Sequence, residues 1–178
     1  MVHETAPHGV IDALLAWDLQ IVLLGTGEPW AHEFFESVAE RRADRFGCKI
    51  AFNKALSHKV EAGSDFYLMP SKFEPCGLNQ MYSLKYGTIP VVRATGGLDD
   101  TVEQYEPETG KGTGFKFQDA TTRAFVNTVG WALYTWYNRK ENIKKLIQHA
   151  MKQHFSWEDS AKKYEALYDK AVKLRRSK

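Results

Sequence analysis

The sequence predicts a three-layer α/β fold in which a parallel sheet lies between two layers of helices. Two observations favour this class. Short apolar segments that suit strands alternate with longer segments of helical periodicity, and the linkers between them are short. The apolar run at 19–24, interrupted only by Gln20, suits a strand that is buried on both faces of a parallel sheet. Right-handed crossovers are therefore expected between successive strands.

The composition fits one soluble globular domain. With 178 residues, 43% hydrophobic and 26% charged, the chain can bury a core and is not of the disordered class. The net charge of +2 gives no indication of nucleic-acid binding, and the basic tail at 173–178 is interpreted as a solvated helix end. No apolar run reaches about 18 residues, so no membrane span is expected. Cys48 and Cys76 lack the spacing of a zinc or redox pair, which favours a reducing, cytoplasmic setting, with Cys48 in the core.

Six elements are expected up to Met69. Asn53 is expected to cap the third helix, and Gly63 suits the left-handed position after it. Residues 1–8 show no period and are expected to be irregular; His3 and His8, five apart in a loop, are a poor signal for a metal site. In order, the expected elements are a helix at 10–17, a strand at 19–24, a helix at 30–45, a strand at 49–52, a helix at 54–62 and a strand at 66–69.

The middle of the chain, residues 69–102, holds two successive junctions between a strand and a helix. A loop follows the strand that ends at Met69, and a helix is expected from about Leu78. A buried strand at 89–92 and a glycine-rich turn at 95–97 come next, and the turn opens another helical turn.

The C-terminal part, residues 121–178, is expected to be helical. Before it, GKGTG at 110–114 is interpreted as a connection to the last strand at 115–117; a phosphate-cradling loop is the alternative, but the Walker spacing is missing. Thr121 or Thr122 can start one helix, and Ser156 with Asp159 resembles a capping box for the last one. A further helix is expected at 140–152. The whole chain is thus expected to form a single domain.

The last helix carries aromatic residues on one face, at Trp157, Tyr164 and Tyr168. This face could pack on the domain's own sheet or dock on a partner.

Three loops are expected at the carboxyl edge of the sheet, where α/β proteins bind ligands: 25–29, 73–79 and 94–97. In the middle loop, the residues from Cys76 to Asn79 would present unpaired backbone N–H groups at the start of a helix, which suits an anionic or hydroxyl-rich ligand. Gly77 lets the backbone approach that ligand closely.

Glu74 and the turn at 95–97, both at this edge of the sheet, each have two interpretations. Glu74 can accept two hydrogen bonds from sugar hydroxyls, or it can merely cap the helix that follows. The turn formed by Thr95, Gly96 and Gly97 is either a tight turn alone or a second contact to a phosphate or sugar.

The string SKFEPCGLNQMYSLKYGTIPVVRATGGLDDTV resembles the signature of bacterial and plant glycogen/starch synthases. These are retaining glucosyltransferases of the GT-B architecture, with two Rossmann-like domains and a nucleotide-glucose donor. LLGTGEP, AGSDFYLMPS, GTGFKF and FSWEDSAKKY extend the resemblance over nearly the whole chain from about Gly9. The resemblance implies that the chain is the C-terminal Rossmann-like domain, with the N-terminal catalytic domain absent.

The resemblance implies a role for several residues. Glu74 matches the glutamate that meets the hydroxyls of the donor sugar, and Phe52 matches an aromatic ring that stacks on adenine; a core position at a strand end is the alternative for Phe52. His58 matches a family histidine and is either part of the site or structural. The positions implied at the donor sugar and diphosphate are Cys76, Gly77, Leu78, Asn79, Thr95, Gly96 and Gly97, with Asn79 sharing only its backbone N–H.

Two departures from the family pattern are informative. Many retaining glycosyltransferases carry a second glutamate eight residues after the first, and here that position is Tyr82, as in the synthase branch. The arginine and lysine pair that grips the diphosphate in the family has no counterpart, because neither residue type occurs before Arg41.

The implied function is binding of ADP-glucose or ADP within an enzyme that transfers glucose to the 4-hydroxyl end of an α-1,4-glucan with retention. The glucan would bind mainly through the missing N-terminal domain, and the fragment alone is expected to be inactive. The resemblance implies no cofactor and no metal, and a plastid location if the source is a plant. Two alternatives remain: a non-catalytic module that binds nucleotide sugar or glucan, and a retaining GT-B transferase for another sugar.

Overall fold

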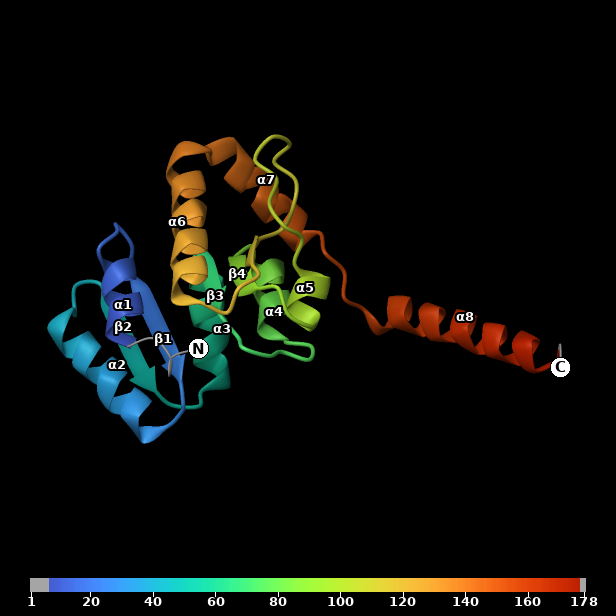
Figure 1. The fold of residues 1–178 in the computed structure, drawn as a ribbon, viewed down its shortest axis with the longest axis horizontal. Coiled ribbons are helices and arrows are strands. Elements are labelled where there is room, and N and C mark those ends of the chain that lie inside the picture. The colour runs from blue at the N-terminus through green and yellow to red at the C-terminus, as the bar shows by residue number, and fades with distance from the viewer. Residues whose placement is uncertain (1–6, 177–178) are drawn as a thin grey trace.

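The computed structural model describes residues 7–176. It contains parallel strands flanked by helices, as the sequence predicts, and thus has the predicted mixed α/β class (Figure 1). The first four elements are α1 (Pro7–Leu15), β1 (Ile21–Gly25), α2 (Pro29–Arg41) and β2 (Phe46–Ile50), and the next four are α3 (Lys54–Gly63), β3 (Phe66–Met69), α4 (Asn79–Tyr86) and β4 (Ile89–Arg93). They are followed by α5 (Gly97–Thr101), β5 (Phe115–Phe117), α6 (Thr122–Asn138), α7 (Lys140–Met151) and α8 (Trp157–Arg176).

The strands form two separately hydrogen-bonded parallel sheets. β1 pairs with β2, with Ile21 opposite Phe46, and β4 lies between β3 and β5, with Phe66 opposite Ile89. In Figure 1, α1, α2, β1 and β2 lie together on the left, beside the part that contains the larger sheet. The expectation that the first strand is buried on both faces is wrong, because Val22 of β1 is 59% exposed.

The larger core surrounds β4 and β5 and explains why this sheet is flanked by helices on both faces. Ile89 and Val91 point to the face covered by α6, whereas Val92 packs with Leu98 of α5 on the other face, as the two-residue period of a strand requires. β4 is accordingly buried over its first four residues. The buried members of the larger core are Leu14, Ile89, Val91, Tyr105, Phe115, Phe117, Phe125, Val129, Ala132, Ile143 and Leu146.

A smaller core holds the β1–β2 sheet against α1 and α2. Its buried members are Leu15, Val38 and Phe46, and Cys48 packs against them, which confirms the expected core role of this cysteine. Burial raises the pKa of the Cys48 thiol, and the negative charge of Glu36 adds to this effect.

Local capping follows the sequence at two helices and departs from it at one. The Asn53 side chain accepts a hydrogen bond from the Leu56 N–H (2.9 Å), and Thr121 accepts one from the Ala124 N–H (3.2 Å), so both predicted caps are confirmed. Gly63 is not left-handed: it is the last residue of α3, and Ser64 follows in an extended conformation.

Several predicted boundaries shift. The helix expected at 30–45 ends at Arg41, because a hydrogen-bonded turn at 42–45 leads directly into β2. β2 therefore begins three residues earlier than expected and ends before Phe52. α1 begins at Pro7, so the expectation of an irregular segment at 1–8 is wrong for its last two residues; residues 1–6, including His3, lie outside the described residues.

The last helix, α8, extends away from the rest of the chain (Figure 1). None of its described residues is buried, so the alternative in which its aromatic face packs on the domain's own sheet is wrong. Trp157 is 83% exposed and Tyr168 is 65% exposed. Among residues 7–176, no helix is long and apolar enough to cross a membrane.

Candidate functional site

The loop between β3 and α4 and the turn between β4 and α5 lie against each other. The Gly97 N–H lies 3.2 Å from the carbonyl oxygens of both Glu74 and Pro75. A Cβ atom on Gly96 would lie 2.0 Å from the Glu74 carbonyl oxygen, and one on Gly97 would lie 2.0 Å from the Cys76 carbonyl oxygen. Contact this close requires glycine at both positions. The structure thus brings together two of the three loops that the sequence places at one edge of the sheet.

Gly77 also needs its missing side chain. Its φ of 73° lies in the left-handed region, and a Cβ atom would lie 2.5 Å from Oε1 of Gln80. This conformation turns the chain sharply into α4, which begins two residues later at Asn79.

The turn into α4 leaves backbone donors available. Within the described part of the chain, no acceptor is found for the N–H groups of Gly77, Leu78 and Asn79. The N–H groups of Thr95 and Gly96 likewise have no acceptor among residues 7–176. Unpaired N–H groups at a helix start attract anions, because the helix dipole adds to their partial positive charge. The two loops therefore offer donors suited to a diphosphate.

Glu74 is the acidic residue of this site and is half-buried. Its backbone carbonyl accepts from Gly97, but within the described residues its carboxylate has no hydrogen-bond or ion-pair partner. α4 has Leu78 at its N-cap position and no side-chain cap. The alternative in which Glu74 merely caps this helix is therefore wrong, and its carboxylate remains available to accept hydrogen bonds from a ligand.

Asn79 uses its side chain within the protein. Its Nδ2 donates to the Tyr67 hydroxyl at 2.8 Å, which ties the start of α4 to β3. Burial raises the pKa of the Tyr67 hydroxyl, and the hydrogen bond from Asn79 partly offsets that rise. This bond uses one of the two N–H groups of the Asn79 amide.

Phe52 is exposed. It lies between β2 and α3, and 91% of its surface is accessible, so the alternative of a core position at a strand end is wrong. Leu78 is 54% exposed at the turn itself. Both side chains are therefore accessible to a ligand.

His58 lies between α3 and α4. Its ring packs edge-on against Tyr82 and Tyr86, and its Nδ1 is 3.7 Å from the Glu61 carboxylate. These contacts place it in the interface between α3 and α4, which fits the structural interpretation of this histidine.

Sequence reasoning missed Gln80, Thr101 and Arg93. Gln80 is fully buried and joins both loops through its amide, and Thr101 completes that connection. Arg93 donates to the carbonyl oxygens of Lys72 and Gln118, which anchors the start of the β3–α4 loop. A polar residue on the buried face of a helix, one turn after a glycine, is the signal that could have identified Gln80.

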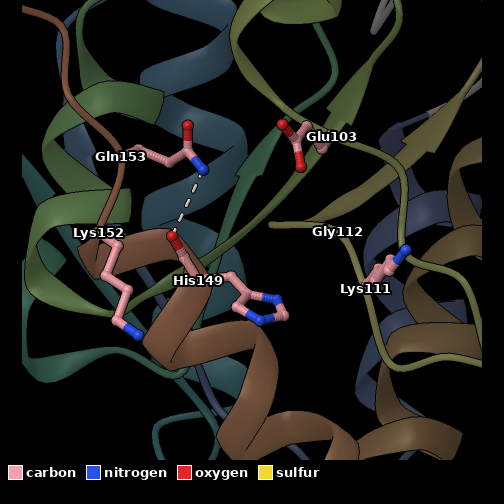
Figure 2. A pocket seen from close by; sticks show the side chains of 6 residues that line it. All are labelled: Glu103, Lys111, Gly112, His149, Lys152 and Gln153. Atoms are coloured by element: carbon pink, nitrogen blue, oxygen red, sulfur yellow. Dashed lines mark hydrogen bonds between the residues drawn. The ribbon is translucent and has the colours of Figure 1, made fainter.

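A shallow hollow of about 280 Å³ lies elsewhere, between α7 and the segment that leads to β5 (Figure 2). Figure 2 shows that the side chains around it come from separate segments, with the Gln153 amide bonded to the His149 carbonyl. A Cβ atom on Gly112 would lie 2.5 Å from the Gln104 carbonyl, so this glycine packs against the chain. The lining residues are Glu103, Lys111, Gly112, His149, Lys152 and Gln153.

No group of three or more His, Cys, Asp or Glu side chains in the described residues is arranged to hold a metal ion. The cysteines are free thiols, and Cys76 is exposed in the β3–α4 loop.

Comparison with known proteins gives consistent matches, although no family model matches the chain. The chain is 54% identical to glycogen synthase 1 of Geobacter metallireducens over 93% of its own length and 33% of that protein. It is 52% identical to the glycogen synthase of Treponema denticola over 89% of its length and 32% of that protein. The chain thus spans about a third of the length of these curated relatives.

A solved structure matches the fold closely. The catalytic domain of starch synthase IV from Arabidopsis thaliana, bound to ADP and acarbose, superposes with a TM-score of 0.81 and 34% sequence identity. The match covers 94% of this chain and 35% of that chain.

Proposed function

We propose that this chain, a homologue of bacterial glycogen synthases over 93% of its length, is the donor-binding domain of a glycosyltransferase that uses ADP-glucose. The observation that carries the proposal is the pair of interlocked glycine loops, whose backbone N–H groups and Glu74 carboxylate have no partner among residues 7–176. The starch synthase IV domain, which is similar in structure, was solved with ADP bound.

The proposed roles follow from the chemistry of each group. The N–H groups of 77–79 and 95–96 would donate to the diphosphate, and the Glu74 carboxylate would accept from hydroxyls of the glucose ring. The exposed ring of Phe52 would stack on adenine.

In the complete enzyme, the bond between glucose C1 and the diphosphate oxygen would break. A bond between C1 and the 4-hydroxyl oxygen of a glucan end would form with the same anomeric configuration, and the hydroxyl proton would leave with ADP. The loop N–H groups would stabilise the negative charge that develops on the departing diphosphate.

The chain alone is expected to bind ADP weakly and not to transfer glucose. Each charge-assisted bond to a phosphate contributes on the order of 1.5–3 kcal/mol. Arg93, the cation in β4 next to the loops, already donates to the carbonyls of Lys72 and Gln118. The bound diphosphate would therefore depend mainly on neutral backbone donors from this chain.

Calorimetry with ADP, ADP-glucose, UDP-glucose and GDP-glucose tests the donor. ADP and ADP-glucose are expected to bind, and the other two donors are expected to bind more weakly. Glu74→Gln should raise the Kd for ADP-glucose several-fold and leave that for ADP unchanged, because the carboxylate meets only the sugar. Phe52→Ala should raise the Kd for both by about tenfold, the factor that corresponds to the lower part of the range for stacking.

Tyr134→Ala is the matched control, since Tyr134 is a 56% exposed aromatic residue of α6. Equal affinity for all four nucleotides, or no effect of Glu74→Gln on ADP-glucose, would contradict the proposal. Adding a separately produced preparation of the remaining two thirds of a relative tests catalysis: recovered glucose transfer supports a transferase, and no recovery supports the non-catalytic binding module.

A further inference from the structure

The Gln80 side chain links the two glycine loops of the candidate site. It is fully buried in the first turn of α4, and its Nε2 lies 3.0 Å from the Cys76 carbonyl and 3.1 Å from the Gly77 carbonyl. The same Nε2 lies 3.0 Å from the Thr101 hydroxyl, which donates to the Gly97 carbonyl. An unbroken chain of hydrogen bonds thus runs from the β3–α4 loop through Gln80 and Thr101 to the β4–α5 turn.

This chain of bonds determines which way two peptide groups point. In a trans peptide, the carbonyl of one residue and the N–H of the next lie in one plane and point in opposite directions. When the carbonyls of Cys76 and Gly77 point inward to Gln80, the N–H groups of Gly77 and Leu78 must point away from it. These are two of the N–H groups for which the described residues provide no acceptor.

A role in packing alone does not account for Gln80. Its Oε1 is buried without a hydrogen-bond partner among residues 7–176. An unpaired buried carboxamide oxygen costs stability that Leu or Met of similar volume would avoid. Gly77 adds to this observation, because the Gln80 amide occupies the space where a side chain at 77 would lie.

We infer that Gln80 is a positioning residue that orients the backbone donors of the β3–α4 loop toward the diphosphate of the donor and, through Thr101, holds this loop against the β4–α5 turn. The inference rests on the proposed function, since it assigns these donors to a nucleotide. Gln80 and Thr101 touch the loop backbone, and the loops touch the ligand.

Thr101→Val tests the connection, because valine keeps the shape of threonine and removes its hydroxyl. The Kd for ADP should rise about tenfold, which corresponds to the loss of one well-placed hydrogen bond. Amide hydrogen exchange should become faster in both 73–80 and 94–98. Thr101→Ser keeps the hydroxyl and should restore both properties to near the wild-type values.

Thr135→Val is the matched control. Thr135 is buried, whereas Thr101 is half-buried, but its hydroxyl likewise donates to the carbonyl four residues earlier, at Trp131 (2.9 Å) in α6. It should leave ADP affinity and exchange of the two loops unchanged. Gln80→Met should raise the Kd for ADP and accelerate exchange of the two loops more than Thr101→Val does. If Gln80→Met does not fold, the Thr101 variants alone test the inference.

The outcomes separate this inference from the proposed function. Faster exchange in Thr101→Val with unchanged ADP affinity would make the link purely structural and overturn the inference. Unchanged exchange and unchanged affinity would overturn it too. If the wild-type chain does not bind ADP at all, the proposed function fails, whereas the exchange data still decide whether Gln80 and Thr101 hold the loops together.

Discussion

At the scale of single residues, Gly96 has the most demanding backbone position of the candidate site. Its φ of 47° and ψ of −132° lie in a region that residues with a side chain rarely adopt, and the Glu74 carbonyl occupies the space beside it. Gly96→Ala should therefore lower the free energy of unfolding by at least about 1–3 kcal/mol, the usual cost of such backbone strain. Thermal unfolding followed by circular dichroism measures the change.

Gly63→Ala provides the control for this substitution. Gly63 ends α3 with a helical conformation, and no atom of the described residues lies within 4 Å of an added Cβ. Alanine should leave stability unchanged or raise it by up to about 1 kcal/mol, because alanine favours helix. Equal stability changes at both glycines would mean that the Glu74 carbonyl can move aside easily.

Glu61 is a buried carboxylate in the α3–α4 interface, with 2% of its surface accessible. Burial raises the pKa of its carboxyl above the ordinary value, and the nearby His58 offsets part of that rise. Because the folded-state pKa lies above the unfolded-state pKa, this group stabilises the fold fully below the unfolded value of about 4.3. That contribution is lost as the pH rises through the raised pKa.

Melting temperatures measured from pH 4 to pH 7 test this effect in wild type and Glu61→Gln. The variant has no carboxylate to bury at this position. The melting temperature of the variant minus that of the wild type should therefore increase as the pH rises. Glu40→Gln, at an exposed position of α2, should follow the wild-type profile throughout. Parallel profiles for wild type and Glu61→Gln would show that the Glu61 carboxylate is hydrated or paired in solution.

At the scale of elements, α8 differs from every other helix in having no buried residue. A chain that ends at Gln153 should therefore melt within about 2 °C of the full chain, because little apolar area is lost.

A chain that ends at Asn138 also loses α7, with the buried residues Ile143, Leu146 and Ala150. This shorter chain should not unfold cooperatively in differential scanning calorimetry. A large loss of stability on removing α8 alone would mean that its aromatic face packs on the domain in solution.

At the scale of the whole molecule, α1 joins the two cores through adjacent residues. Leu14 is part of the larger core around β4 and β5, whereas Leu15 is part of the smaller core beside β2. A two-stranded sheet has little stability of its own, so β1 and β2 depend on these contacts. Amide hydrogen exchange should accordingly be faster in β1 and β2 than in β3, β4 and β5.

Leu14→Ala and Leu15→Ala form a matched pair, with 2% and 3% of the leucine surface accessible. Each substitution should lower the free energy of unfolding by about 2–5 kcal/mol, the usual range for truncating a buried leucine to alanine. Leu15→Ala should accelerate exchange mainly in α2, β1 and β2, whereas Leu14→Ala should act on the larger sheet as well. If both variants accelerate exchange equally everywhere, the two cores unfold as one unit.

The sequence by itself determined the features that depend on local interactions. The apolar periodicity located the helices and strands. Because a cap involves residues only three positions apart, the sequence also indicated Asn53 for one helix and Thr121 or Thr122 for another, and the structure has Thr121 as the cap. The string around Glu74 indicated the family, and the curated relatives agree with it at up to 54% identity. Both glycine loops were also expected at one edge of a sheet, since parallel strands place their carboxyl ends together.

Only the tertiary structure decided the features that depend on distant contacts. The link from Gln80 to Thr101 spans 21 residues, and no local pattern reports it. The division of the strands into two sheets, the exposure of Phe52 and the isolation of α8 likewise depend on which surfaces meet. Periodicity shows which face of an element is apolar. Packing and long-range hydrogen bonds decide which other element that face contacts.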